Sequence, residues 1–320
     1  MIRLWNALLG VLSIAAFTAA GPAWTESFPT RPVHLVVPFA AGGTTDVAAR
    51  KLGDLLRARW NQGVVVENRT GAGTIIGTLA VARAAADGYT ILMTDSSLAT
   101  NDVLYSKLPY DLKTQLAPVT TLVTWPLGIT VNSSLGVTSL AELVALSKTR
   151  ELSYGSFGPG STPNMAMELF KSVSGARITH VPFNGVAPVL LALGSDTVQV
   201  TMMGAGAAVP LVKDGKLRML ALDSPSALMP GVPTFKDAGF PGMRAPSWWG
   251  IAVPAGTPPE IVAKLSDDIR TALKDPSLHD FLVANGYDPV GDSPAEFGAR
   301  IKATIDLWGP ITKAANIHLD

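Results

Sequence analysis

Residues 37–46 hold the side chains and backbone groups that could bind an anion. Gly42 and Gly43 follow an apolar, β-branched stretch and precede an amphipathic one, which predicts a loop between a strand and the start of a helix. The first N–H groups of a helix are unpaired and its dipole is positive there, so such a terminus attracts anions. The hydroxyls of Thr44 and Thr45 can add hydrogen bonds. The loop carries no catalytic acid or base, which indicates binding rather than conversion.

A second loop of the same kind spans Gly155 to Thr162. It also joins a strand signal to a helix, with Thr162 as the expected N-cap and Pro163 as the first helical residue. Either loop alone is consistent with ordinary helix capping. Their corresponding positions in two halves of the chain favour a ligand that is held from both sides.

Several single residues have both a structural and a functional interpretation. We expect Asp46 to hold its loop by accepting backbone N–H groups, because a carboxylate in contact with an anionic ligand would repel it. His180 precedes a loop that could face a cleft, but a packed histidine is favoured. Trp248 and Trp249 are either a core pair or an aromatic wall, and the core is favoured. Residues 94–96 end a predicted parallel strand, where open α/β sheets place their ligands.

Other chemistries find little support in the sequence. The P-loop lysine is missing from Gly155–Ser161, and Gly71–Gly77 reads GxGxxxG where dinucleotide binding needs GxGxxG. The chain has no cysteine and no Gly-x-Ser-x-Gly elbow. Its four histidines show no metal-binding spacing. We therefore expect no catalytic residue, no cofactor and no metal, and a secreted enzyme acting on a carboxylate or ester is a minor alternative.

The elements that position these loops alternate along the chain. Strand signals at Val33–Val37, Val64–Glu67 and Tyr89–Thr94 enclose helix signals at 46–60 and 74–85, which predicts a parallel βαβαβ sheet. A second region has strand signals at Leu127–Val131, Ser153–Ser156, Ile178–Val181, Val198–Met203 and Leu217–Leu222. Near the end, Thr257, Asp275 and Ser293 each precede proline and mark three helix starts.

The N-terminus has the pattern of a secretory signal peptide. Arg3 is followed by an apolar run to Ala20 and by a small-x-small site, so cleavage is expected after Ala23 or near Ala20. A membrane anchor is the competing interpretation, and the short run followed by prolines favours cleavage. Without Arg3 the chain has 24 basic and 25 acidic side chains, which argues against nucleic acid as a partner. A cysteine-free secreted chain fits the bacterial periplasm.

At this point an ordered set of motifs resembles the substrate-binding proteins of tripartite tricarboxylate transporters, also called the Bug family. The matching segments are Arg31–Val33, Val37–Asp46, Val66–Gly73, Asp87–Thr90, Leu108–Asp111, Tyr154–Ser156, His180–Gly185, Gly215–Arg218, Val232–Phe235 and Pro254–Pro258. They cover nearly all of the mature chain.

The resemblance implies an α/β, two-lobed type II periplasmic-binding fold with a ligand cleft at the hinge. The order of the strand and helix signals predicts that residues 28–122 and 224–320 form a discontinuous first lobe and residues 123–223 the second. The resemblance also implies a small organic carboxylate as ligand and membrane transporter subunits as partners. A monomer is the default expectation for a receptor that closes on its ligand. Sequence does not separate this role from that of a periplasmic sensor partner. The implied ligand contacts are Ala41, Gly42, Gly43, Thr44 and Thr45 from one side, Ser156, Ser161 and Thr162 from the other, and Phe39, Ser96, Phe183 and Gly204 in the cleft.

Three departures from the family pattern bear on the ligand. Asn164 stands where histidine is frequent, Asn184 where lysine or arginine is frequent, and Gly204–Gly206 where many members have a phenylalanine-aspartate pair. We expect Phe39, Asn164, Asn184 and Gly204 to decide which ligand fits. Losing the aspartate removes a partner for an ammonium group and opens space, which predicts a carboxylate without an amino group, aromatic or bulky in shape.

Overall fold

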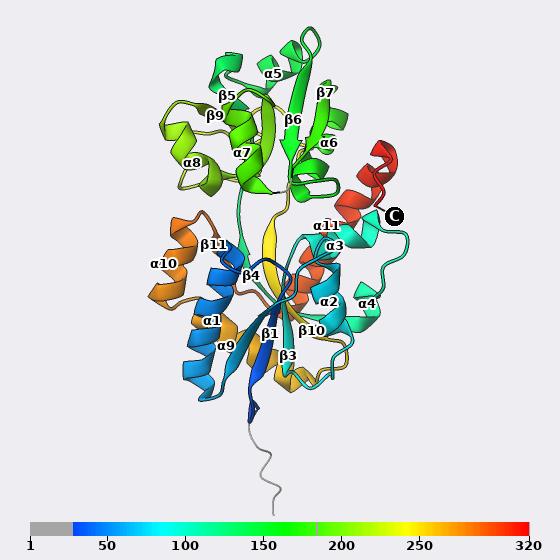
Figure 1. The fold of residues 1–320 in the computed structure, drawn as a ribbon, viewed down its shortest axis with the longest axis vertical. Helices are drawn as coiled ribbons and strands as arrows, with labels where there is room; N and C mark the ends of the chain where they lie inside the picture. Colours follow the sequence, from blue (N-terminus) through cyan, green and yellow to red (C-terminus); the bar gives the residue numbers. More distant parts are fainter. Residues whose placement is uncertain (1–27, 184, 320) are drawn as a thin grey trace, which may run out of the picture. The chain divides into compact units, whose positions relative to one another are not determined.

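Two β-sheets organise the chain (Figure 1). The computed structural model describes residues 28–183 and 185–319, with its helices and strands between Val33 and Ala315. The proposed signal peptide, residues 1–23, lies outside the described residues, as does Asn184. This α/β architecture confirms the predicted fold class.

The first sheet has six strands within the described residues, in the order β11-β4-β10-β3-β1-β2. β1 pairs in parallel with β2 and with β3, as the alternation of strand and helix signals predicts. β10 comes from late in the sequence and pairs antiparallel with β3 and β4, so this sheet combines both ends of the chain. Its strands are β1 (Val33–Val37), β2 (Val64–Asn68), β3 (Thr90–Asp95), β4 (Leu116–Thr124), β10 (Trp248–Pro254) and β11 (Asp288–Pro289).

The second sheet has five strands within the described residues, in the order β7-β6-β8-β5-β9. β6 pairs in parallel with β7 and β8, while β5 pairs antiparallel with β8 and β9. Its strands are β5 (Leu127–Asn132), β6 (Leu152–Ser156), β7 (Ile178–Pro182), β8 (Val200–Gly204) and β9 (Leu217–Leu222). Each sheet therefore brings the carboxyl ends of neighbouring parallel strands to one edge, where ligand-binding loops gather.

Helices cover both sheets. The helices on the side of the first sheet are α1 (Thr44–Trp60), α2 (Ile75–Ala82), α3 (Ser97–Leu104), α4 (Leu112–Gln115), α9 (Pro259–Ala272), α10 (Pro276–Ala284) and α11 (Pro294–Ala315). The helices on the side of the second sheet are the 3₁₀ turn η1 (Ser133–Leu135), α5 (Leu140–Leu146), α6 (Thr162–Ser174), α7 (Val186–Gly194) and α8 (Ala205–Lys213).

The predicted caps are correct at two of the three late helices. Asp275 accepts a hydrogen bond from the Ser277 N–H, and Ser293 forms a full capping box with Glu296. Thr257 does not cap α9, because its hydroxyl instead donates to the Pro254 carbonyl at 2.7 Å. At α6 the cap is Ser161 and not Thr162, so Thr162 is the first residue of the helix.

The chain crosses between the sheets at residues 125–126 and again at residues 223–247. Phe235 and Met243, on the second crossing, are buried in the same apolar cluster as Ile129 and Phe170 of the second sheet's layer. Trp308 near the end of α11 is fully buried in that cluster too. The last part of the chain therefore packs against both sheets, and the lobe boundaries at 123 and 223 stay predictions.

Candidate functional site

A cavity of about 680 Å³ lies where loops from both sheets meet. Its lining includes the predicted site residues Phe39, Thr45, Ser96, Ser161, Thr162 and Gly204. The first turns of several helices contribute to its wall: Thr45, Ser97, Thr162, Val186 and Gly206 lie at the starts of α1, α3, α6, α7 and α8. Of the described residues that line it, none has a cationic side chain. The cavity thus presents helix N-termini and hydroxyls to a ligand.

The first loop is held from behind by Asp46, which is buried. Its carboxylate accepts hydrogen bonds from the Gly42 N–H at 2.9 Å, from the Asn68 side-chain amide at 2.9 Å and from the Arg50 guanidinium at 3.1 Å. Burial opposes ionisation, but these hydrogen bonds outweigh it and lower the pKa of Asp46. Asp46 therefore stays ionised and fixes the turn of the loop.

The residues of the first loop that were predicted to contact a ligand differ in whether they line the cavity. Thr45 and Phe39 line the cavity. Ala41, Gly42, Gly43 and Thr44 are exposed beside it and are not among its lining residues. The Gly42 N–H is donated to Asp46, and contact of these four residues with a ligand stays a prediction.

In the second loop, Ser156 lies behind the cavity and not in its wall. Its side chain is fully buried, bonds His180 Nε2 at 2.7 Å and contacts the backbone of Gly158. The His180 ring stacks on Tyr154 with 4.9 Å between centroids, and burial lowers the pKa of His180. Direct contact of Ser156 with a ligand therefore has no support from the structure, and the serine supports the loop.

Asn164 and Phe183 also lie outside the cavity lining. Asn164 is buried, accepts a hydrogen bond from the Gly160 N–H at 2.9 Å and donates to the Tyr154 hydroxyl at 2.7 Å. Phe183 packs in a satellite apolar cluster of the second sheet. The structure gives Asn164 the role of a loop anchor, since both ends of its amide are used inside the protein.

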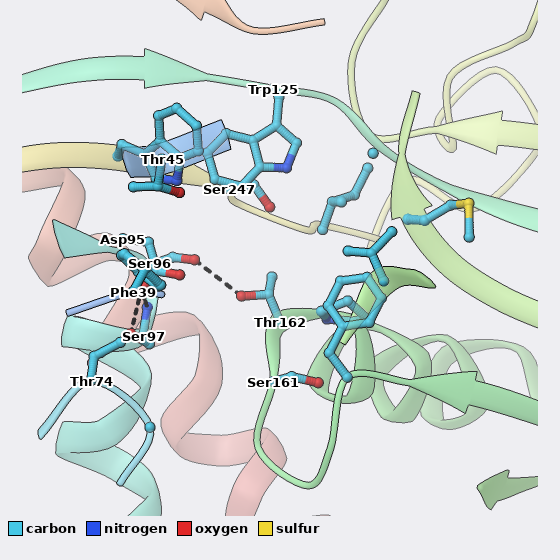
Figure 2. A pocket seen from close by; sticks show the side chains of 18 of the residues that line it. Phe39, Thr45, Thr74, Asp95, Ser96, Ser97, Trp125, Ser161, Thr162 and Ser247 are labelled. Atoms are coloured by element: carbon cyan, nitrogen blue, oxygen red, sulfur yellow. Dashed lines mark hydrogen bonds between the residues drawn. The ribbon is translucent and has the colours of Figure 1, made fainter. Parts of the chain in front are cut away.

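A hydrogen bond joins the two walls of the cavity. Ser96 follows β3 of the first sheet and Thr162 begins α6 of the second, and their hydroxyl oxygens lie 3.0 Å apart. Figure 2 shows this bond between the wall that carries Asp95, Ser96 and Ser97 and the facing Thr162. Ser161 lies beside it and donates to the Gly158 carbonyl at 2.7 Å. The hydroxyls predicted in separate loops are thus neighbours.

The aromatic wall that was the less favoured interpretation of Trp248 and Trp249 is formed by Trp249, together with Trp125 and Tyr287, which the sequence did not indicate. Trp125, Trp249 and Tyr287 line the cavity and pack on one another, with ring centroids 4.3–5.5 Å apart. Burial raises the pKa of Tyr287 to about 12. Trp248 points the other way, into the core against Phe297. Successive side chains of a strand alternate between faces, which is the signal that could have separated the two tryptophans.

A polar corner lies at the end of β3, where the sequence predicted a ligand position at residues 94–96, and the segment that follows β2 adds Thr74 to it, which was not predicted. The Thr74 and Ser97 hydroxyls are 2.9 Å apart, and Ser97 donates both its hydroxyl and its N–H to Asp95. Four successive residues, 71–74, have positive φ, and Gly73 and Thr74 line the cavity. The glycines of 71–77, which failed as a dinucleotide motif, therefore shape part of this cavity. Asp95 also supplies a cavity carboxylate, which removes the argument from Gly204–Gly206 against a ligand with an ammonium group.

Two further properties concern metals and membranes. The described residues contain no group of three or more metal-ligating side chains. In the same residues, no helix combines the length and apolar character needed to cross a membrane.

Comparison with known proteins decides the family. Residues 48–317 match the model of the tripartite tricarboxylate transporter family receptor, TctC. The chain belongs to this family. It is 35% identical to the protein BugT of Bordetella pertussis over 320 residues, which cover 98% of both chains. TctC receptors are periplasmic solute-binding proteins and not enzymes, which confirms the interpretation of this chain as a binding protein.

Solved structures of this family include complexes with carboxylates. The R. palustris protein Rpa4515, solved with adipate, is 36% identical, with a TM-score of 0.79 and coverage of 91% of this chain and 99% of that one. MatC of Rhodopseudomonas palustris, solved with bound malate, is 29% identical, with a TM-score of 0.76 and coverage of 89% and 99%. Both likenesses extend over the two sheets and so confirm the two-lobed periplasmic-binding fold.

Proposed function

We propose that this chain is a periplasmic receptor that captures a small organic carboxylate between its two lobes and delivers it to the membrane subunits of a tripartite tricarboxylate-type transporter. Di- and tricarboxylates and aromatic carboxylates are the candidate ligands. An N-terminal signal peptide, residues 1–23, would direct it to the periplasm, where it would act as a monomer.

One observation carries the proposal: the first turns of α1, α3, α6 and α8 line a single cavity. Each N-terminus carries the positive end of a helix dipole, so their convergence favours a negative charge, although Asp95 accepts the first N–H of α3 and Ser161 accepts the Asn164 N–H of α6. Because the lining has no cationic side chain among its described residues, N–H and hydroxyl donors are left to bind the carboxylate. Hydrogen bonds to a charged acceptor are strong enough for this role.

The direct contacts would come from Thr45, Ser96, Ser161 and Thr162, with Ala41, Gly42, Gly43 and Thr44 at the first loop and Phe39 and Gly204 shaping the space. Ser96 and Thr162 belong to opposite walls, and their bond needs the walls to be close. A carboxylate that replaces or joins this bond would favour the closed arrangement, because only that arrangement offers donors from both walls.

The test is thermal stabilisation by a panel of adipate, malate, citrate and benzoate. A ligand at a hundred times its Kd stabilises the folded state by about 2.7 kcal/mol, which raises Tm by several degrees. The double variant Ser96→Ala with Thr162→Val should weaken binding about tenfold or more, because it removes both facing hydroxyls. The control pair Ser134→Ala with Thr149→Val changes exposed residues of the same types and should keep the full shift. An equal shift in both double variants would contradict the proposed site.

Delivery needs a separate measurement. Cells that lack this receptor should lose uptake of the stabilising compound and regain it when the wild-type chain is restored. Restoration by the Ser96→Ala, Thr162→Val variant to the wild-type rate at low substrate concentration would contradict the proposal.

A further inference from the structure

Asp95 is the one charged side chain among the described residues that line the cavity. It ends β3 and pairs directly with Trp249 of the neighbouring strand β10. Residues opposite each other in an antiparallel pair project on the same face, so the carboxyl group and the indole ring are neighbours. A carboxylate beside an aromatic wall therefore forms part of the surface that a ligand meets.

The hydrogen bonds of Asp95 leave one oxygen available. Oδ1 accepts both the Ser97 N–H, at 2.9 Å, and the Ser97 hydroxyl. Besides Ser97, the Asp95 backbone N–H contributes a hydrogen bond to the carboxyl group, and no side chain of the described residues donates to Oδ2. The ordinary role of an aspartate just before a helix is to accept its first N–H, and Oδ1 already does this at α3. Oδ2 therefore remains available as an acceptor at the cavity wall.

A carboxylate oxygen in a cavity raises the free energy of the folded protein unless a hydrogen-bond donor reaches it. Burial raises the pKa of Asp95, which shows that its ionised form is poorly solvated there. A ligand group that donates a hydrogen bond to Oδ2 would recover part of that free energy. A second ligand carboxylate at the same place would instead meet a like charge, with no cationic side chain among the described lining residues to separate the two.

The aromatic rings beside Asp95 favour the same kind of ligand group. The rings of Trp249, Trp125 and Tyr287 form one packed group beside this corner. Aromatic faces attract cations and accept flat apolar bodies, but they offer nothing to a carboxylate. The corner thus suits an ammonium or hydroxyl group carried on an apolar body.

We propose that Asp95 is a specificity-determining residue, which binds a hydrogen-bond donor on the non-carboxylate part of the ligand and disfavours a second carboxylate there. The proposal rests on the proposed function, since it assumes that a first carboxylate is held by the helix N-termini. It narrows the ligand to hydroxy- or amino-carboxylates in preference to dicarboxylates of the same length.

Isothermal titration with two matched series tests the proposal. The linear series is adipate, 6-hydroxyhexanoate and 6-aminohexanoate; the ring series is terephthalate, 4-hydroxybenzoate and 4-(aminomethyl)benzoate. In the wild type, the hydroxy or amino member should bind about tenfold more tightly than the dicarboxylate of its series. Comparison of the two donor members separates a hydroxyl ligand from an ammonium ligand.

Two variants sharpen the test. Asp95→Asn keeps an oxygen for Ser97 but removes the charge, so the preference should shrink to about threefold or less. Asp102→Asn changes an aspartate of α3, the helix that follows Asp95, outside the cavity lining, and should leave the ranking unchanged. If Asp95→Asn does not fold, the wild-type ranking decides alone.

Different outcomes overturn different statements. A dicarboxylate that binds most tightly in the wild type overturns the role of Asp95, and so does a ranking that Asp95→Asn leaves unchanged. Dicarboxylate binding that strengthens as the pH falls would make a protonated Asp95 the donor, which also overturns it. If none of the six compounds binds either protein while malate, citrate or benzoate stabilises the wild type, the inference fails and the proposed function stands; if no carboxylate of either set binds, the proposed function fails as well.

Discussion

The two loops that face each other across the cavity use the same geometry with different chemistry. In each, the third residue of the helix accepts the N–H of a glycine four residues earlier at 2.9 Å: Asp46 accepts from Gly42, and Asn164 from Gly160. Asp46 is ionised and paired with Arg50, whereas Asn164 is neutral and donates to the buried hydroxyl of Tyr154. The loops are thus equivalent in shape and differ in charge.

What lies behind each loop explains this difference. Arg50 is half exposed, so a charged pair at the first loop keeps contact with water. Asn164 is packed against Tyr154 in the core of the second sheet, where an unpaired carboxylate would carry a large desolvation cost. Equivalent loops therefore receive a charged or a neutral anchor according to the solvent access of their support.

Replacing each anchor by alanine should give the largest difference between the loops, measured as the loss in the free energy of unfolding. Asp46→Ala leaves Arg50, Asn68 and the Gly42 N–H without their acceptor, and we expect a loss of about 3 kcal/mol in the free energy of unfolding. Asn164→Ala removes two neutral hydrogen bonds and should cost about 2 kcal/mol. Urea denaturation at neutral pH measures both values. A larger cost for Asn164→Ala would show that charge is not what distinguishes the loops.

The two equivalent glycines give a second, smaller test. Gly42 and Gly160 both have positive φ, so alanine is strained by about 1 kcal/mol at either position. An added Cβ at Gly42 would have no atom within 4 Å, but at Gly160 it would lie 2.6 Å from methyl groups of Leu104 and Leu319. We expect Gly160→Ala to be the more destabilising variant, by about 1 kcal/mol.

Adipate binding extends this glycine comparison. Leu104 ends α3 of the first sheet's side, so a side chain at Gly160 also pushes the two walls apart. Gly160→Ala should therefore weaken adipate binding more than Gly42→Ala does, as measured by titration calorimetry. Equal losses of affinity in the two variants would show that the walls tolerate this displacement.

The smallest expected difference between the two loops is in the pH at which each loses its supporting hydrogen bonds. Burial lowers the pKa of His180 below its usual value of 6.5, although Glu168 opposes this, so the unfolded chain takes up a proton there before the folded chain does. The support that His180 gives to the second loop is complete above about pH 6.5 and is lost as the pH falls further. For Asp46, burial is outweighed by hydrogen bonds, so the support of the first loop persists until the pH falls below about 3.8.

NMR of ¹⁵N-labelled glycines can follow both loops. The Gly158 amide should shift below about pH 6.5, while the Gly42 amide should stay constant until about pH 4. His180→Gln should abolish the earlier transition and leave the later one. A common midpoint for both amides would contradict the assignment of separate supports.

Much of this site follows from local sequence. The glycine and hydroxyl pattern locates both loops and both helix starts, because turns and caps depend on a few neighbouring residues. The same local rules predict that Asp46 anchors its loop, and the hydrogen bond from the Gly42 N–H to its carboxylate agrees with that prediction.

The orientation of single side chains depends on contacts that are distant in sequence. Ser156 turns inward because His180, on the neighbouring strand β7, offers a buried partner, and Asn164 turns inward toward Tyr154. Asp95 and Trp249 meet only because β3 and β10, which are 154 positions apart, pair in one sheet. No local pattern contains that pairing. The sequence indicated a ligand position at residues 94–96 and left two interpretations of Trp249, but neither segment alone predicts that Asp95 and Trp249 are neighbours.

The central claim is that one carboxylate is held by both loops at once. The most direct measurement is a titration of ¹⁵N-glycine-labelled protein with adipate and 6-hydroxyhexanoate, in which the amides of Gly42, Gly43, Gly158 and Gly160 are followed together. Our account predicts that amides of both loops shift along one saturation curve with a common Kd for each compound that binds. Shifts confined to one loop, or different Kd values for the two loops, would contradict it.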